Sequence, residues 1–132
     1  MKKNNSNTQK VPNEVKYFLG KDPLSVTVMA LSLVFGSAHK YICENSKILN
    51  PYDGTTTLVF GYETKEQKLG CKNAANAVVS SAKKLMILVP QLQTPKLNKE
   101  QRDYIKELNK TLKQFALPGV LYGYEEMGKM EI

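Results

Sequence analysis

The chain has 132 residues, 42% of them hydrophobic, and carries 19 basic against 12 acidic side chains, a formal net charge of +7. This length suits one domain with its own hydrophobic core, and two cysteines, Cys43 and Cys71, are too few for a disulfide framework. The sequence therefore favours a reducing, cytoplasmic setting and, because of the positive charge, acidic partners.

The kind of basic residue argues against sequence-specific DNA recognition. Arg102 is the only arginine among the 19 basic residues, whereas guanine is usually read by the bidentate fork of an arginine. Lysine binds phosphate but carries no sequence information. An AT-rich genome also favours lysine codons, so part of the positive charge is open to a compositional explanation.

The N-terminal end of the chain is predicted to be unfolded. Residues 1–13 form a predicted disordered basic tail, because the opening MKKNNSNTQK has no apolar side chain after Met1 to offset the entropy of ordering. Residues 14–132 are predicted to form a single globular domain.

No membrane partner is expected. The longest apolar run, residues 24–35, is too short to span a bilayer. A secretory signal cleaved near residues 36–38 is disfavoured by the long segment before the apolar run and by Pro12, Asp22 and Pro23.

The first predicted helix begins at Asp22, a good N-cap residue, with Pro23 in the first helical position, and it runs to about Asn45. Its sequence is apolar nearly all round, which predicts a buried central helix. Residues 50–54, NPYDG, are then predicted to form a turn. A strand follows over residues 55–62, TTTLVFGY, because β-branched and aromatic residues dominate it.

The second predicted helix opens with a capping box, in which Gln67 reaches back to the amide of Thr64, and it extends to Val89 before Pro90. One side of this helix is apolar and the other is rich in lysine. The lysines of the candidate polyanion-binding site are Lys65, Lys68, Lys72, Lys83 and Lys84. The alternative interpretation is the ordinary solvated face of an amphipathic helix.

The third predicted helix covers residues 99–116, with Asn98 as its cap. Pro118 and Gly119 end it, and residues 120–124, VLYGY, are predicted to form a second strand. The fold class is therefore α+β and mainly helical, with three helices packed with a small two-stranded sheet in a single domain. Whether the two strands run parallel or antiparallel stays open.

One pentapeptide occurs twice with small changes, as VFGYE at residues 59–63 and LYGYE at residues 121–125. If both copies are strands, alternation places the aromatic side chains on one face and leaves the glycine face bare. The predicted aromatic ledge consists of Phe60, Tyr62, Tyr122 and Tyr124. It is either a half-buried strand pair or a stacking surface for bases or a nucleotide, and a chance likeness of five residues is the third interpretation.

Residues for bond-making chemistry are sparse. His39 and Cys43 stand four apart on the first predicted helix, a spacing that suits half of a metal site or a thiol–imidazole pair. Only Cys71 and a carboxylate remain to complete a zinc site, and no acid is placed to orient the histidine. The alternative is a packed cysteine and a histidine at the rim of the core. We therefore expect no catalytic residues, no metal, no cofactor and no enzymatic activity.

The sequence favours a non-enzymatic basic protein for binding or assembly, which docks on a larger protein or nucleoprotein complex. Small size and a Lys- and Asn-rich composition are typical of accessory proteins or virion components of phages and mobile elements, which would work in the host-cell cytoplasm or the virion. One alternative is sequence-nonspecific nucleic-acid binding. A second is nucleotide sequestration by Tyr62 and Tyr124 with Lys83 or Lys84. Homo-oligomerisation is compatible with either.

Overall fold

The computed structural model describes residues 19–132, so the predicted tail over residues 1–13 lies outside the described part of the chain. From Leu19 onward the protein is mainly helical with one small sheet, which confirms the predicted class, although it has four α-helices where three were expected. The elements are α2 (Pro23–Asn45), β1 (Lys47–Asn50), β2 (Val59–Gly61), α3 (Lys65–Leu88), the 3₁₀ turns η1 (Val89–Gln91) and η2 (Thr94–Lys96), α4 (Lys99–Phe115) and α5 (Pro118–Lys129).

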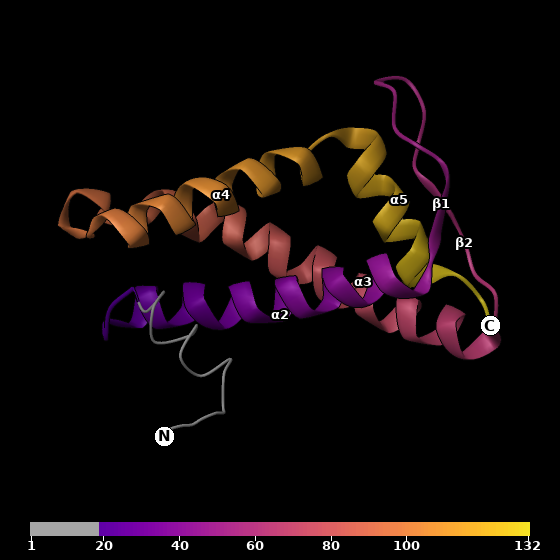
Figure 1. Ribbon diagram of the computed structural model, residues 1–132, viewed down its shortest axis with the longest axis horizontal. Coiled ribbons are helices and arrows are strands. Elements are labelled where there is room, and N and C mark those ends of the chain that lie inside the picture. The colour runs from indigo at the N-terminus through magenta and orange to yellow at the C-terminus, as the bar shows by residue number, and fades with distance from the viewer. Residues whose placement is uncertain (1–18) are drawn as a thin grey trace.

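Helices α2 and α3 form the central pair, and α4 and α5 pack on it from the side opposite the outer face of α2 (Figure 1). The pairing follows from apolar or small side chains that recur every three or four residues on each helix. The buried residues of α2 are Ser25, Val28, Ser32, Phe35, Ala38 and Ile42, and those of α3 are Cys71, Ala75, Val78, Ser81, Ala82 and Leu85. Figure 1 also shows the β1–β2 hairpin at one end of the molecule, beside α5.

The three predicted helix starts are confirmed because local hydrogen bonds fix them. The Asp22 carboxylate accepts from the Ser25 amide at 3.0 Å. The capping box of α3 joins Thr64 and Gln67 as expected, and α4 begins with a similar box around Asn98. Each cap pairs amides that would otherwise lack a partner in the first turn.

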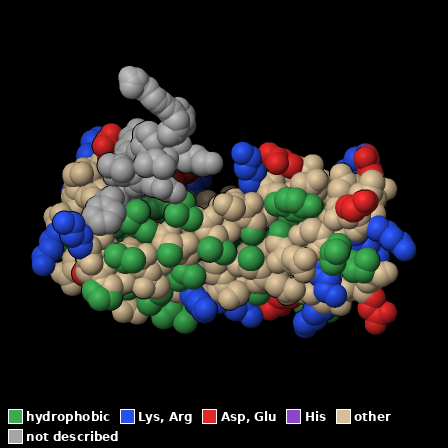
Figure 2. Space-filling view, turned by 90° about the horizontal axis from the view of Figure 1, so that it is seen from below, with side chains coloured by type: hydrophobic (Ala, Val, Ile, Leu, Met, Phe, Trp, Pro, Cys, Tyr) green, Lys and Arg blue, Asp and Glu red, His purple; other side chains and the backbone are tan. Residues whose placement is uncertain are grey.

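Helix α2 is buried on one side only, so the expectation of an apolar helix enclosed all round is wrong. Val26, Leu33 and Val34 expose 48%, 49% and 47% of their surfaces. Figure 2, which looks onto α2, shows hydrophobic side chains spread along this face. By length and composition alone, α2 is also the one helix among the described residues that could cross a membrane, a test that core helices pass as well.

The sheet is a local antiparallel hairpin in which Ile48 pairs with Phe60. The second strand expected over residues 120–124 is wrong, because this segment lies inside α5. Gly119 and Gly123 stand one turn apart on α5, and the hairpin lies directly against them. The Leu58 amide donates a hydrogen bond to the Gly119 carbonyl oxygen at 3.2 Å. Packing between the helix and the hairpin therefore outweighs the strand propensity of VLYGY.

Candidate functional site

A row of positive charge runs along the outer side of α4. Its members, which we call the α4 cationic face, are Arg102, Lys106, Lys110 and Lys113. They line one open hollow of about 620 Å³ together with Thr94, Ile105, Glu107 and Asn109. Two further hollows differ in charge: one between the hairpin and α5 is lined by no basic side chain, and one beside the end of α2 is lined by Lys47 as its single basic residue.

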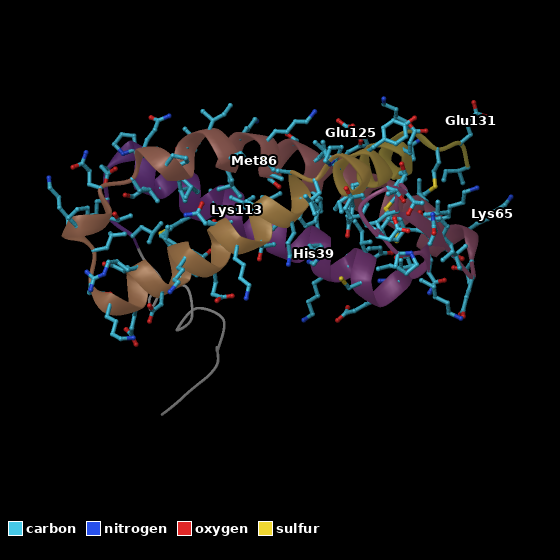
Figure 3. All side chains as sticks on the ribbon, turned by 90° about the horizontal axis from the view of Figure 1, so that it is seen from above. His39, Lys65, Met86, Lys113, Glu125 and Glu131 are labelled. Carbon is cyan, nitrogen blue, oxygen red and sulfur yellow. The ribbon has the colours of Figure 1, made fainter. Side chains whose placement is uncertain are left out.

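The helix itself sets this arrangement. The four basic residues follow one another at spacings of four, four and three, which keeps them on one side of a helix with 3.6 residues per turn. On the other side, α4 buries Ile105, Leu108, Leu112 and Phe115 in the core. The core contacts thus hold the basic side chains outward, and Lys113 is labelled in Figure 3.

The charge of the α4 cationic face is largely unneutralised by residues 19–132. Among residues 19–132, none of Lys106, Lys110 and Lys113 forms a salt bridge. The Arg102 guanidinium donates to the carbonyl oxygen of Leu97, which ties the start of α4 to the preceding turn. A row of cations with few salt bridges of its own attracts an acidic surface or a polyanion from outside.

The lysines predicted on α3 do not form one continuous site. Lys65, Lys68 and Lys72 lie in the first turns of the helix, whereas Lys83 is about 27 Å from Lys65 along the axis. The Lys83 ammonium also pairs with the Glu125 carboxylate at 3.0 Å. Figure 3 shows Lys65 near one end of the molecule and Glu125 nearer its middle. The structure therefore divides the predicted group into a cluster at the start of α3 and an exposed ion pair between Lys83 and Glu125 farther along the helix.

The four aromatic residues of the predicted ledge do not lie on one common surface either. Tyr124 is 5% exposed and its ring lies 5.2 Å from that of Phe60 and 4.8 Å from that of Phe115. Tyr122, two residues earlier on the same helix, is 51% exposed. Positions two apart on a helix face away from each other. The predicted ledge depended on residues 120–124 being a strand, and they are part of α5 instead.

Burial affects the hydroxyls of Tyr62 and Tyr124 in the same direction. Desolvation raises the pKa of Tyr124 to about 12, and that of the half-buried Tyr62 to about 12, because the phenolate is disfavoured away from water. Tyr124 and Phe60 join an aromatic cluster with Phe35, His39 and Phe115. The last tyrosine of LYGYE therefore packs on the phenylalanine of VFGYE, which explains one part of the repeat structurally.

His39 and Cys43 do meet, but neither is activated. The Cys43 sulfur lies 3.7 Å from the His39 Nε2. Burial, and to a lesser extent the Glu44 carboxylate, raises the pKa of the Cys43 thiol, while burial lowers the pKa of His39. Both groups are thus held in their neutral forms, which is the opposite of a reactive thiolate–imidazolium pair. Cys71 is a buried free thiol, and no three His, Cys, Asp or Glu side chains of residues 19–132 are grouped to hold a metal.

No protein family, no curated protein and no solved structure matches the chain. The α4 cationic face is therefore the leading candidate on geometry and charge alone. The sequence contains the signal for this site, because the spacing places Arg102, Lys106, Lys110 and Lys113 on one helical face. The prediction named the lysines of α3 instead, because α3 has more lysines.

Proposed function

We propose that the protein is a non-enzymatic binding or assembly protein that docks on an acidic surface of a larger protein or nucleoprotein complex through the α4 cationic face. The observation that supports this most is the set of four basic side chains around one hollow, three of them without a salt bridge in the described chain. Complementary charge of this kind steers association and fixes orientation more than it adds affinity.

An acidic protein surface suits the hollow better than the closely spaced phosphates of a nucleic acid. Glu107 lines the hollow beside the basic residues, and Asp103 lies one turn from Lys106 on the same side of α4 in a pair with Lys99 at 2.8 Å. A carboxylate within a basic surface repels phosphate but selects a partner that presents a basic group at the matching place. Mixed charge therefore favours a protein partner of defined shape.

Sequence-nonspecific nucleic-acid binding is the second candidate. The α4 cationic face extends for about 17 Å along the helix, enough for contacts with successive phosphates. Nucleotide sequestration receives less support, because the predicted ledge is divided and Tyr124 is buried among aromatic rings. The positive charge on α4 therefore supports two candidate functions, docking on an acidic protein surface and binding of nucleic acid.

The test compares two lysine pairs with identical spacing. The double variant Lys106→Glu/Lys110→Glu alters the α4 cationic face, and Lys68→Glu/Lys72→Glu makes the same change in charge on α3. Binding of fluorescent polyglutamate and of short duplex DNA is measured by anisotropy over a salt series. We expect the α4 variant to weaken polyglutamate binding about tenfold or more, and the α3 variant to bind nearly as the natural chain does.

The outcomes separate the candidates. Strong DNA binding whose logarithmic salt slope falls by about two units in the α4 variant would favour the nucleic-acid alternative. Equal losses in both double variants would show that net charge alone governs binding, and this result would remove the α4 cationic face as the site.

A further inference from the structure

The outer side of α2 presents an apolar strip that no other described element covers. We call it the α2 outer face, and its members are Val26, Ala30, Leu33 and Val34. It extends for about 12 Å along the helix. Hydrophobic side chains are visible along this side in Figure 2. A contiguous exposed apolar strip of this length is typical of an interaction surface.

The strip is also the least charged part of a basic molecule. From Pro23 to Ala38 the helix carries no acidic or basic side chain. Two copies of a chain with net charge +7 repel each other. That repulsion is weakest where the approaching surfaces themselves carry no charge, so α2 is the side on which two copies can meet.

The spacing along the strip matches a seam between paired helices. Val26, Ala30, Leu33 and Ser37 follow at intervals of four, three and four, which is the alternation that keeps a row of side chains facing a partner helix. Ala30 and Ser37 are small and allow close approach of the two backbones. In an antiparallel pair with its two-fold axis between Leu33 and Val34, Ala30 of one copy faces Ser37 of the other.

The charges at the two ends of α2 decide the orientation. Lys21 and Asp22 stand at the start of the helix, and Lys40 and Glu44 lie near its end on the same side as Val26. An antiparallel pair places each Glu44 close to Lys21 and the positive helix N-terminus of the other copy. A parallel pair would instead bring like charges together at each end.

We infer that the α2 outer face binds a second copy of this chain in an antiparallel, two-fold symmetric pair. Such a pair is self-complementary, as two-fold interfaces must be. An interface made of one short helix face from each copy is small beside the roughly 1,200–2,000 Å² that stable specific complexes bury. The association is therefore reversible and depends on concentration.

A lipid surface fits the strip less well. Membrane-surface helices surround their apolar face with Lys and Arg, whereas here each lysine at an end of the helix has an acid beside it, Asp22 next to Lys21 and Glu44 one turn from Lys40. The balanced charges at the ends are better matched by an inverted copy of the same strip. Binding to anionic vesicles is included below as an outcome that would overturn the dimer.

The experiment measures sedimentation velocity of the full chain over a concentration series. Leu33→Glu places a charge at the centre of the strip, and the matched control Ile87→Glu makes the same change at a 66% exposed position on α3. We expect the natural chain and the control to dimerise alike, and Leu33→Glu to raise the dissociation constant about tenfold or more. Circular dichroism checks that each variant keeps its helix content, and Val34→Lys replaces any variant that does not.

Charge reversal tests the orientation separately. Lys21→Glu and Glu44→Lys should each weaken the dimer, and the variant with both changes should recover it, because opposite charges again meet across the interface. Failure of the combined variant to recover would overturn the antiparallel arrangement.

Three results would overturn the dimer itself. The first is a natural chain that stays monomeric throughout the series. The second is an equal response to Leu33→Glu and Ile87→Glu. The third is a monomer that pelleted with phosphatidylserine vesicles in a Leu33-dependent way, which would assign the strip to a lipid surface.

Discussion

Gly123 of α5 lies directly against the backbone of Leu58, so that a Cβ atom at position 123 would come within 2.7 Å of the Leu58 carbonyl oxygen. A backbone oxygen cannot rotate away as a flexible side chain can. The absence of a side chain at position 123 therefore brings the hairpin onto α5, and with it places Phe60 on Tyr124.

Gly123→Ala is predicted to destabilise the protein by about 1–3 kcal/mol, because the forced shift of the hairpin outweighs the gain in helix propensity. Gly36→Ala is the matched control: Gly36 is also helical, but a Cβ atom at this position would meet no other atom within 4 Å. That variant should stabilise by about 0.5–1 kcal/mol. Urea unfolding measures both, and equal effects would contradict the packing at Gly123.

The two tyrosines of LYGYE are predicted to contribute very differently to stability. Tyr124→Ala removes a ring that is 5% exposed and should cost about 3–5 kcal/mol, as for other buried aromatic residues. Tyr122→Ala removes a ring that is 51% exposed and should cost under about 1 kcal/mol. Thermal unfolding of the two variants provides the comparison, and similar losses would instead favour a shared ledge.

Alkaline pH is predicted to weaken the fold through Tyr124. Burial raises its pKa from the ordinary 10.0 to about 12, so the folded protein keeps the neutral phenol where the unfolded chain already ionises. This contribution to stability is complete below pH 10, declines as the pH rises from 10 to about 12, and is lost above that window. The melting temperature of the natural chain should fall relative to that of Tyr124→Phe as the pH rises through this window, and an unchanged difference would contradict the assignment.

Cys43 is predicted to react slowly with iodoacetamide at neutral pH, because its thiol pKa is raised by burial and by Glu44. Glu44→Gln should accelerate alkylation modestly by removing the negative charge. His39→Ala should leave the rate unchanged or raise it, since the imidazole does not ionise the thiol. A marked slowing in His39→Ala, followed by mass spectrometry, would show an activated pair and would reopen the question of catalysis.

Local signals made much of the helical frame predictable. Asp22, Thr64 and Asn98 begin helices because their side chains accept hydrogen bonds from amides three residues later, within the same short stretch of chain. Such contacts depend on neighbours in the sequence and on nothing distant. The starts of α2, α3 and α4 could therefore be predicted without knowledge of the fold.

The C-terminal helix and the first strand depend on distant contacts and were not predictable in this way. Helix α5 begins at Pro118 with no side-chain cap, and its next residues favour strands. Its helical form is supported by packing on α3, where the Asn76 amide donates to the Gly128 carbonyl at 3.2 Å. Likewise β1 forms because β2 lies beside it, and its four residues carry no strong strand signal of their own.

Part of the candidate site could be predicted from the sequence. Excess positive charge and its grouping on helices could be predicted, but which group remains unpaired could not. Lys83 is neutralised by Glu125, which is 42 residues away, whereas Lys106, Lys110 and Lys113 have no salt bridge in the described chain. Only the tertiary structure distinguishes a lysine that already forms a salt bridge from one that can bind a partner.

Helices α2 and α4 lie on opposite sides of the molecule (Figure 1), and each buries its other side in the core, so the α2 outer face and the α4 cationic face are directed away from each other. A neighbour bound at one side leaves the other unobstructed, because the α2–α3 core stands between them. Under the two proposals above, the chain would act as a connector that binds a different neighbour on each side. Two joined copies would hold both charged faces outward and could bridge separate bodies, gaining avidity from the link alone.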